Sequence, residues 1–205
     1  MAHKFFEEKR PHTGLTYEEY SNAFLSYTQT KNKNFSSDAE KELFDYTKLN
    51  YQRSSRIDKN YKISDEVRKN IESIDEPQIW MLITENWCGD SAQNLPYIAK
   101  IAAINPLIDF RIILRDSNED IMDMYLTNGT RSIPKLIVFN LEGNEIFQWG
   151  PRPVEAQKVI LEAKAENLPK KEMYERLHLW YGRDNGKQLE KEIVQKVIEH
   201  TEKII

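Results

Sequence analysis

Cys88, the single cysteine of the 205 residues, is the side chain best placed for chemistry. It lies in residues 85–92 (Glu-Asn-Trp-Cys-Gly-Asp-Ser-Ala), between an apolar run at 79–84 and apolar residues at helical spacing in 92–104. A thiol at the start of a helix meets unsatisfied backbone N–H groups and the positive end of the helix dipole. Both lower its pKa toward the reactive thiolate. The position therefore predicts a nucleophilic thiol.

Two polar residues that follow Cys88 are further catalytic candidates, Asp90 and Ser91. A carboxylate this close to the sulfur raises the thiol pKa and opposes the helix terminus, so the sequence leaves the sign of the net shift open. Asp90 can transfer protons, or it can be an acid that favours the helix dipole. Ser91 is expected to be a first-turn hydroxyl rather than a nucleophile, because no base stands beside it.

The elements around the cysteine alternate between strands and helices. Four segments have the apolar, β-favouring composition of strands: 78–84, 109–114, 135–140 and 144–149. Helices at 92–104 and 118–126 separate the first three, which therefore need helical crossovers. The link 140–144 is short and contains glycine, which predicts an antiparallel hairpin. The order predicts an α/β fold.

Helical patterns flank this block on both sides. Thr16 and Glu19 have the spacing of a capping box at the first of them. The predicted helices are 16–27, 36–53 and 64–74 before the block, 154–166 at its end, and two more from 169 on, split at 182–186. We expect an N-terminal helical region at 1–77, a core at 78–166 and a C-terminal helical extension at 167–205.

Several residues, taken in order, resemble those of the thioredoxin family. The Trp-Cys-Gly-Pro-Cys motif of that family corresponds to residues 87–91, and its kink proline, eight residues after the nucleophile, to Pro96. Residues 129–139 resemble the segment that carries its cis-proline, which corresponds to Pro134. Two glycines match the hairpin turn and the end of the last strand, Gly143 and Gly150. The resemblance covers about residues 78–166. Within the family, the chain resembles a bacterial subgroup whose site has one thiol.

This resemblance implies a thioredoxin-like fold, a central mixed sheet flanked by helices, with added helices at both ends. It implies that Cys88 attacks disulfides, with Trp87 shielding the thiol. The backbone of Ile133, before a cis Pro134, would bind an extended substrate beside the sulfur. Ser91 replaces the second cysteine of the family, so an outside thiol must release the mixed disulfide. The buried acid of the family corresponds to Leu82, so its proton relay is absent.

Composition limits the partners. The net charge of −4 is spread along the chain, so we expect no nucleic-acid partner, and no run approaches a membrane span. One cysteine cannot form an internal disulfide, which favours the reducing cytoplasm. Four scattered histidines give no metal-ligand spacing, and we expect no metal or cofactor. The expected partners are proteins or low-molecular-weight thiols and disulfides.

Three functions stay open. The first is a monothiol thiol–disulfide oxidoreductase that serves cell redox homeostasis through Cys88. The second is a redox-inactive binding module on a thioredoxin fold, favoured by the absence of a second cysteine. The third is a thiol that senses peroxides or electrophiles. Arg152 is expected to form an ion pair at a helix start or on the surface rather than to bind a ligand.

Overall fold

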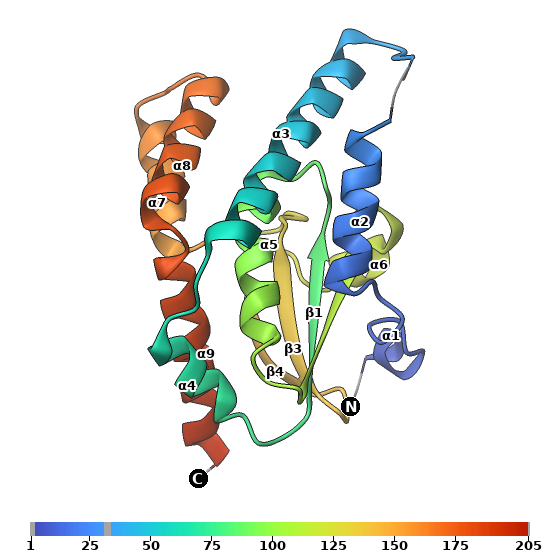
Figure 1. Cartoon of the computed structure of the whole chain (residues 1–205), viewed down its shortest axis with the longest axis vertical. Helices are drawn as coiled ribbons and strands as arrows, with labels where there is room; N and C mark the ends of the chain where they lie inside the picture. The colour runs from blue at the N-terminus through green and yellow to red at the C-terminus, as the bar shows by residue number, and fades with distance from the viewer. Residues whose placement is uncertain (1–2, 31–33, 205) are drawn as a thin grey trace.

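The computed structural model describes residues 3–30 and 34–204. Its sheet has four strands in the order β2-β1-β3-β4, where β1 is parallel to β2 and antiparallel to β3. β3 and β4 form the predicted antiparallel hairpin. The strands are β1 (Gln78–Thr84), β2 (Ile108–Leu114), β3 (Lys135–Asn140) and β4 (Glu145–Trp149). This mixed sheet with flanking helices confirms the predicted α/β thioredoxin-like fold (Figure 1).

Strand β1 is the centre of the core, and all seven of its residues are buried. Side chains alternate between the two faces of a strand, so β1 contributes to two separate apolar clusters. Trp80 and Leu82 belong to the larger cluster, and Ile79, Met81 and Ile83 belong to the smaller. Both faces of β1 are therefore covered, which explains why its sequence is a continuous apolar run.

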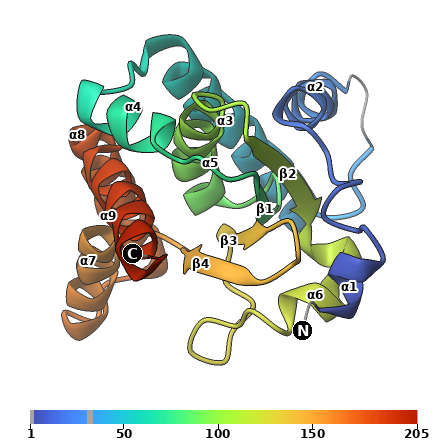
Figure 2. The same ribbon diagram turned by 90° about the horizontal axis from the view of Figure 1, so that it is seen from below.

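Helices of unequal number cover the two faces (Figure 2). The larger cluster lies under α2 (Tyr17–Thr28), α3 (Asp38–Asn60), α4 (Asp65–Glu72), α5 (Gly89–Ala102) and α9 (Lys187–Ile204). The smaller lies under α1 (Lys4–Glu7) and α6 (Glu119–Met122), and it includes Cys88. The cysteine thus faces the thinner layer of the molecule.

The last helices form a layer beside the sheet. α7 (Val154–Ala165) and α8 (Lys170–Asp184) pack on each other through a cluster of their own. α9 returns along the edge of the sheet, where Trp149 of β4 donates a hydrogen bond from Nε1 to Glu192 Oε2 at 2.7 Å. The C-terminal helices are therefore fixed to the edge of the sheet and to the helices beside it (Figure 1).

The N-terminal region is helical, as predicted, and Thr16 and Glu19 form the predicted capping box. α3 is longer than the predicted 36–53. α6 is shorter than the predicted 118–126 because it ends at Met122, where a turn follows, and the 3₁₀ turn η1 (Arg115–Ser117) precedes it. Before β1, the described residues contribute one isolated bridge to the sheet, between Leu15 and Ile112 of β2. No helix in the described part of the chain is long and apolar enough to cross a bilayer.

Candidate functional site

Cys88 is the N-cap residue of α5, at the predicted corner between a strand and a helix. Its Sγ accepts a hydrogen bond from the backbone N–H of Ser91 at 3.4 Å. The thiol donates to the backbone oxygen of Ile133, with 3.2 Å between Sγ and O. The peptide bond from Ile133 to Pro134 is cis. The structure therefore brings Cys88 together with Ser91 and the backbone before Pro134.

The thiol of Cys88 is protonated at neutral pH. Its side chain is buried, with 8% of the residue exposed. Burial, together with the Asp90 carboxylate, raises the pKa of Cys88 to about 11, although the backbone N–H and the side chain of Ser91 oppose this rise. The net direction, which the sequence left open, is therefore upward, and the helix terminus does not produce a stable thiolate.

Both carboxylate oxygens of Asp90 have strong partners. Arg152 donates to Oδ2 from Nε at 3.1 Å and from Nη2, and the Tyr181 hydroxyl donates to Oδ1 at 2.6 Å. Asn94 Nδ2 donates to Tyr181 Oη at 3.0 Å. Burial raises the pKa of Asp90, while Arg152 and Tyr181 oppose it. These contacts hold the carboxylate in place, and proton transfer between Asp90 and Cys88 stays a prediction.

Arg152 forms the expected ion pair just before a helix, but its partner Asp90 is buried and the pair does not lie on the surface. The side chain of Arg152 is 16% exposed and that of Asp90 is 9% exposed. Residue 152 follows β4, and the first turn of α5 holds Asp90, so 62 positions separate the two partners. The ion pair therefore joins the segment after the hairpin to the helix that begins at the thiol.

Ser91 donates its backbone N–H to the thiol, and its side chain also lowers the pKa of Cys88. The residue is 1% exposed, and its Oγ has no hydrogen-bond partner among the described residues. A serine nucleophile needs a base within hydrogen-bond reach, and none is bonded to this oxygen. The geometry thus agrees with the expectation that Ser91 is not a nucleophile.

Trp87 is half-buried and is held from two sides. The Arg115 guanidinium lies over its ring, 4.6 Å from the centroid. Its backbone oxygen accepts a hydrogen bond at 3.0 Å from Nδ2 of Asn50, a fully buried residue of α3. Arg53 in turn donates to Asn50 Oδ1 at 2.8 Å. Helix α3 therefore fixes the loop that precedes the thiol.

Sequence reasoning missed the contacts on the other side of this loop, at Gly89. A Cβ atom at Gly89 would lie 2.3 Å from Tyr46 Oη and 3.2 Å from His178 Cε1. His178 Nε2 and Tyr46 Oη are 3.2 Å apart, and Gln93 Nε2 is 3.2 Å from His178 Nδ1. Any side chain here requires Tyr46 to shift, because α3 and α8 both approach the start of α5. The spacing of the histidines in the sequence bears only on metal binding and gives no signal that His178 packs against the start of α5.

His178 is a neutral ring. Burial lowers the pKa of His178 to about 4, and the charge of Arg53 contributes. The Gln93 amide can only donate to Nδ1, so we assign the ring proton to Nε2, which donates to Tyr46 Oη. The described residues contain no group of three His, Cys, Asp or Glu side chains that could hold a metal ion.

A buried carboxyl that the sequence analysis did not consider lies three residues before the thiol. Glu85 is 8% exposed, and its Oε1 accepts from the backbone N–H of Asp116 at 2.9 Å. Burial raises the pKa of Glu85, and the Asp116 N–H opposes this rise. The acid sought at position 82 is absent, and Glu85 instead anchors the turn after β2.

The comparisons with known proteins agree with this geometry. Residues 36–167 match the family model described as thioredoxin, which is more than half of the chain. The chain belongs to the thioredoxin family. No curated protein matches it. The match ends before α8 begins, so Tyr181 and His178 lie outside the segment that defines the family.

Two solved structures show the same fold. One is a crystal structure of an HIV epitope-scaffold, with a TM-score of 0.57 and 17% identity over 94% of this chain and 96% of that one. The other is a protein of unknown function from Pseudomonas aeruginosa, with a TM-score of 0.56 and 16% identity over 91% of this chain and 99% of that one. At these identities the likeness concerns the fold alone.

Proposed function

We propose that this thioredoxin-family protein acts as a monothiol in thiol–disulfide exchange through Cys88. One observation carries the proposal. The sulfur lies at the helix N-cap between the Ser91 N–H and the Ile133 carbonyl, beside Pro134. The backbone of Ile133 can bind an extended substrate, and the half-buried Trp87 offers it an apolar surface.

The exchange requires a thiol from outside. The Cys88 thiolate attacks one sulfur of a disulfide, the S–S bond breaks, and the other sulfur leaves as a thiolate. The product is a mixed disulfide on Cys88. Ser91 cannot attack it, because a hydroxyl does not take part in thiol–disulfide exchange. A low-molecular-weight thiol attacks the mixed disulfide instead, is itself oxidised to a disulfide, and returns Cys88 to the thiolate.

The pKa sets the pH dependence of this cycle. With the pKa of Cys88 at about 11, the thiolate fraction at pH 7 is small and grows about tenfold for each pH step of one. The exchange should therefore accelerate up to about pH 11. A cycle that consumes external thiols suits a reducing compartment, and we propose the bacterial cytoplasm as its location.

A second function has an observation of its own. The same buried thiol, 8% exposed and with a raised pKa, suits a redox-inactive module that binds a partner. In that case Cys88 is part of the packing, and the added helices supply the binding surface. The two functions make opposite predictions for a Cys88→Ala variant, because only the first loses activity.

Mass spectrometry after incubation with oxidised glutathione tests the proposal. We expect one glutathione per chain, bound at Cys88, with a rate that rises from pH 7 to pH 10 and is reversed by added reduced glutathione. Cys88→Ala is the control and should stay unmodified. If Cys88 stays unmodified at pH 10 while a reference thiol reacts, the exchange proposal fails and the binding module is favoured.

A further inference from the structure

Three hollows among the described residues line the seam between the N-terminal and C-terminal helices, and none of them contains Cys88. The one between α4 and α9, of about 600 Å³, has Glu66, Glu190 and Glu199 in its lining as well as Lys187 and Lys191. The other two have no such cluster of carboxylates.

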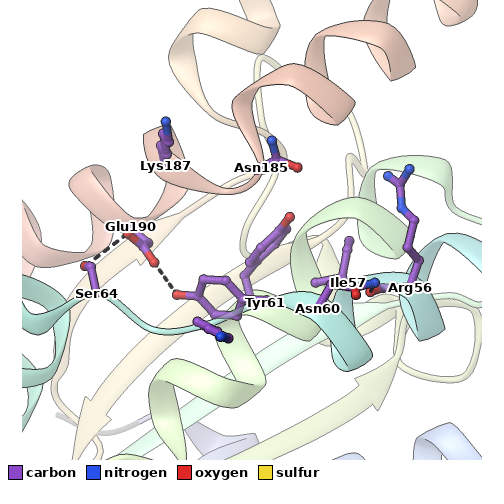
Figure 3. A pocket seen from close by; sticks show the side chains of 10 residues that line it. Arg56, Ile57, Asn60, Tyr61, Ser64, Asn185, Lys187 and Glu190 are labelled. Atoms are coloured by element: carbon purple, nitrogen blue, oxygen red, sulfur yellow. Dashed lines mark hydrogen bonds between the residues drawn. The ribbon is translucent and has the colours of Figure 1, made fainter.

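The first of the other two hollows, of about 500 Å³, lies between α3 and α8, with Gln93 of α5 also in its lining. The second, also about 500 Å³, lies where the link from α3 to α4 faces the turn from α8 to α9. Arg56 lines both. Figure 3 shows Arg56 on the α3 side of the second hollow and Lys187 on the α9 side, with Tyr61 between them.

Positive charge dominates the hollow between α3 and α8 and the hollow beside the link from α3 to α4. The first hollow has Arg53, Arg56 and Arg183 in its lining and no carboxylate. The second has Arg56 with two lysines, Lys62 and Lys187. The two hollows thus hold three cations each and share Arg56. This is a local concentration of positive charge on a chain whose net charge is −4.

Carboxylates do not neutralise these cations. None of the five takes part in an ion pair in the described part of the chain. The second hollow is lined by one carboxylate, Glu190, which accepts hydrogen bonds from Tyr61 and from Ser64. Asp184 lies close by: its two oxygens accept from the backbone N–H of Gln188 at 3.2 Å, and burial raises its pKa while the charge of Lys187 opposes this rise. The guanidinium groups of Arg56 and Arg183 are therefore available to an incoming anion, whereas Arg53 also donates to Asn50 Oδ1 and lies over the Tyr46 ring.

The walls of both hollows also offer apolar surface. In the first, Leu49 is 41% exposed and Leu179 is 54% exposed. In the second, the rings of Tyr61 and Tyr97 pack edge to face, with centroids 4.6 Å apart. Each volume lies in the range of pockets for small molecules, roughly 300 to 1,000 Å³. Cations next to apolar walls suit an organic anion better than a bare inorganic ion.

We propose that the two hollows form one binding site for a small organic polyanion that carries carboxylate or phosphate groups at both ends. One charged end lies among Arg53, Arg56 and Arg183, and the other lies between Arg56 and Lys187. Arginine binds both carboxylate and phosphate through two parallel N–H donors, so Arg56 is the central contact. An acidic protein segment would need the same charges but would make its contacts over a wider surface.

Titration of the full chain with fructose 1,6-bisphosphate and with citrate at low salt tests this site, followed by amide chemical shifts. We expect saturable shifts in α3 and in the turn from α8 to α9. Arg56→Gln should weaken binding roughly tenfold, which is the loss of one charge-assisted hydrogen-bond pair. The matched control is Arg68→Gln, because Arg68 pairs with Glu72 on α4 and lines neither hollow. It removes the same charge and should leave the affinity unchanged.

Three results would overturn the proposal. One is the absence of shifts at millimolar concentrations of both probes. Another is equal weakening by Arg56→Gln and Arg68→Gln, since this indicates a general effect of charge. The last is saturable binding of a hexaglutamate peptide at the two hollows without binding of either small anion, which would favour docking of an acidic protein segment. Oxidised glutathione is not one of the probes, so these results do not depend on the chemistry of Cys88.

Discussion

Two ionisable groups at the start of α5, Cys88 and Asp90, lie two residues apart and have different hydrogen-bond partners. Asp90 accepts hydrogen bonds from the guanidinium of Arg152 and the hydroxyl of Tyr181, and Asn94 donates a hydrogen bond to that hydroxyl oxygen. Cys88 has one backbone N–H and one backbone oxygen. The positive charge that could stabilise a thiolate lies instead at the carboxylate. The comparison shows why a cysteine at a helix N-terminus is a protonated thiol here, and each experiment below alters one side of it.

Removal of the cation on the Asp90 side has the largest expected effect. Arg152→Met leaves a buried carboxylate without its partner and should lower the free energy of unfolding by about 3 to 5 kcal/mol. Denaturant unfolding measures it. The double variant Asp90→Asn with Arg152→Met should recover part of the loss, because no charge is left unpaired. Equal free energies of unfolding for Arg152→Met and the double variant would show that Asp90 and Arg152 do not contribute to stability as a pair.

The neutral ring at His178 predicts a dependence of stability on pH. Its folded pKa of about 4 lies below the unfolded value, so the unfolded chain takes up the proton first. Stability should therefore fall as pH drops from about 6.5 to 4, by about 2 to 3 kcal/mol from this group. His178→Gln should reduce the slope of unfolding free energy against pH in this range. An unchanged slope would show that His178 is protonated in the fold.

The close contact at Gly89 predicts a loss of stability on substitution. Gly89→Ala places a methyl group against Tyr46 Oη and should cost about 1 to 3 kcal/mol in thermal or denaturant unfolding. Gly182→Ala is the control, because a Cβ there meets nothing within 4 Å and the position is inside α8. It should stabilise the protein by about 0.5 to 1 kcal/mol. A neutral Gly89→Ala would show that Tyr46 moves aside easily.

The smallest effect is on the thiol itself. Asp90→Asn removes a negative charge beside Cys88 and should lower the thiol pKa below about 11. Alkylation by iodoacetamide at pH 8 should be roughly tenfold faster, in proportion to the thiolate fraction. Asp116→Asn, at an exposed position, is the control and should leave the rate unchanged. If Asp90→Asn leaves the alkylation profile unchanged, burial alone sets the pKa.

The parts of this protein that sequence could predict are those that depend on neighbours along the chain. The apolar run at 78–84 predicts a buried strand, because the apolar type of its residues by itself indicates burial. Cys88, Pro96 and Pro134 predict the corner at the thiol through their spacing. The fold and the candidate thiol therefore follow from local pattern together with the family resemblance.

The electrostatics of the site could not be predicted, because they depend on contacts between distant parts of the chain. Tyr181 lies 91 positions after Asp90, and nothing in the pattern of α8 marks one tyrosine as its donor. Arg152 follows two residues after a glycine and resembles an ordinary residue at a helix start. The direction of the Cys88 pKa shift depends first on burial and then on the Asp90 carboxylate, and burial follows only from the three-dimensional arrangement.

The hydrogen bond from Tyr181 to Asp90 has a consequence for how this protein is divided into parts. The family match ends at residue 167, and α8 begins after it. A chain shortened to the family segment would keep every residue of the Trp-Cys-Gly-Asp-Ser motif and would still lose the hydroxyl donor of Asp90. Water would replace it, and the field at the sulfur would change. The motif and α8 therefore form one electrostatic unit, and a shortened chain without α8 should have a different thiol pKa.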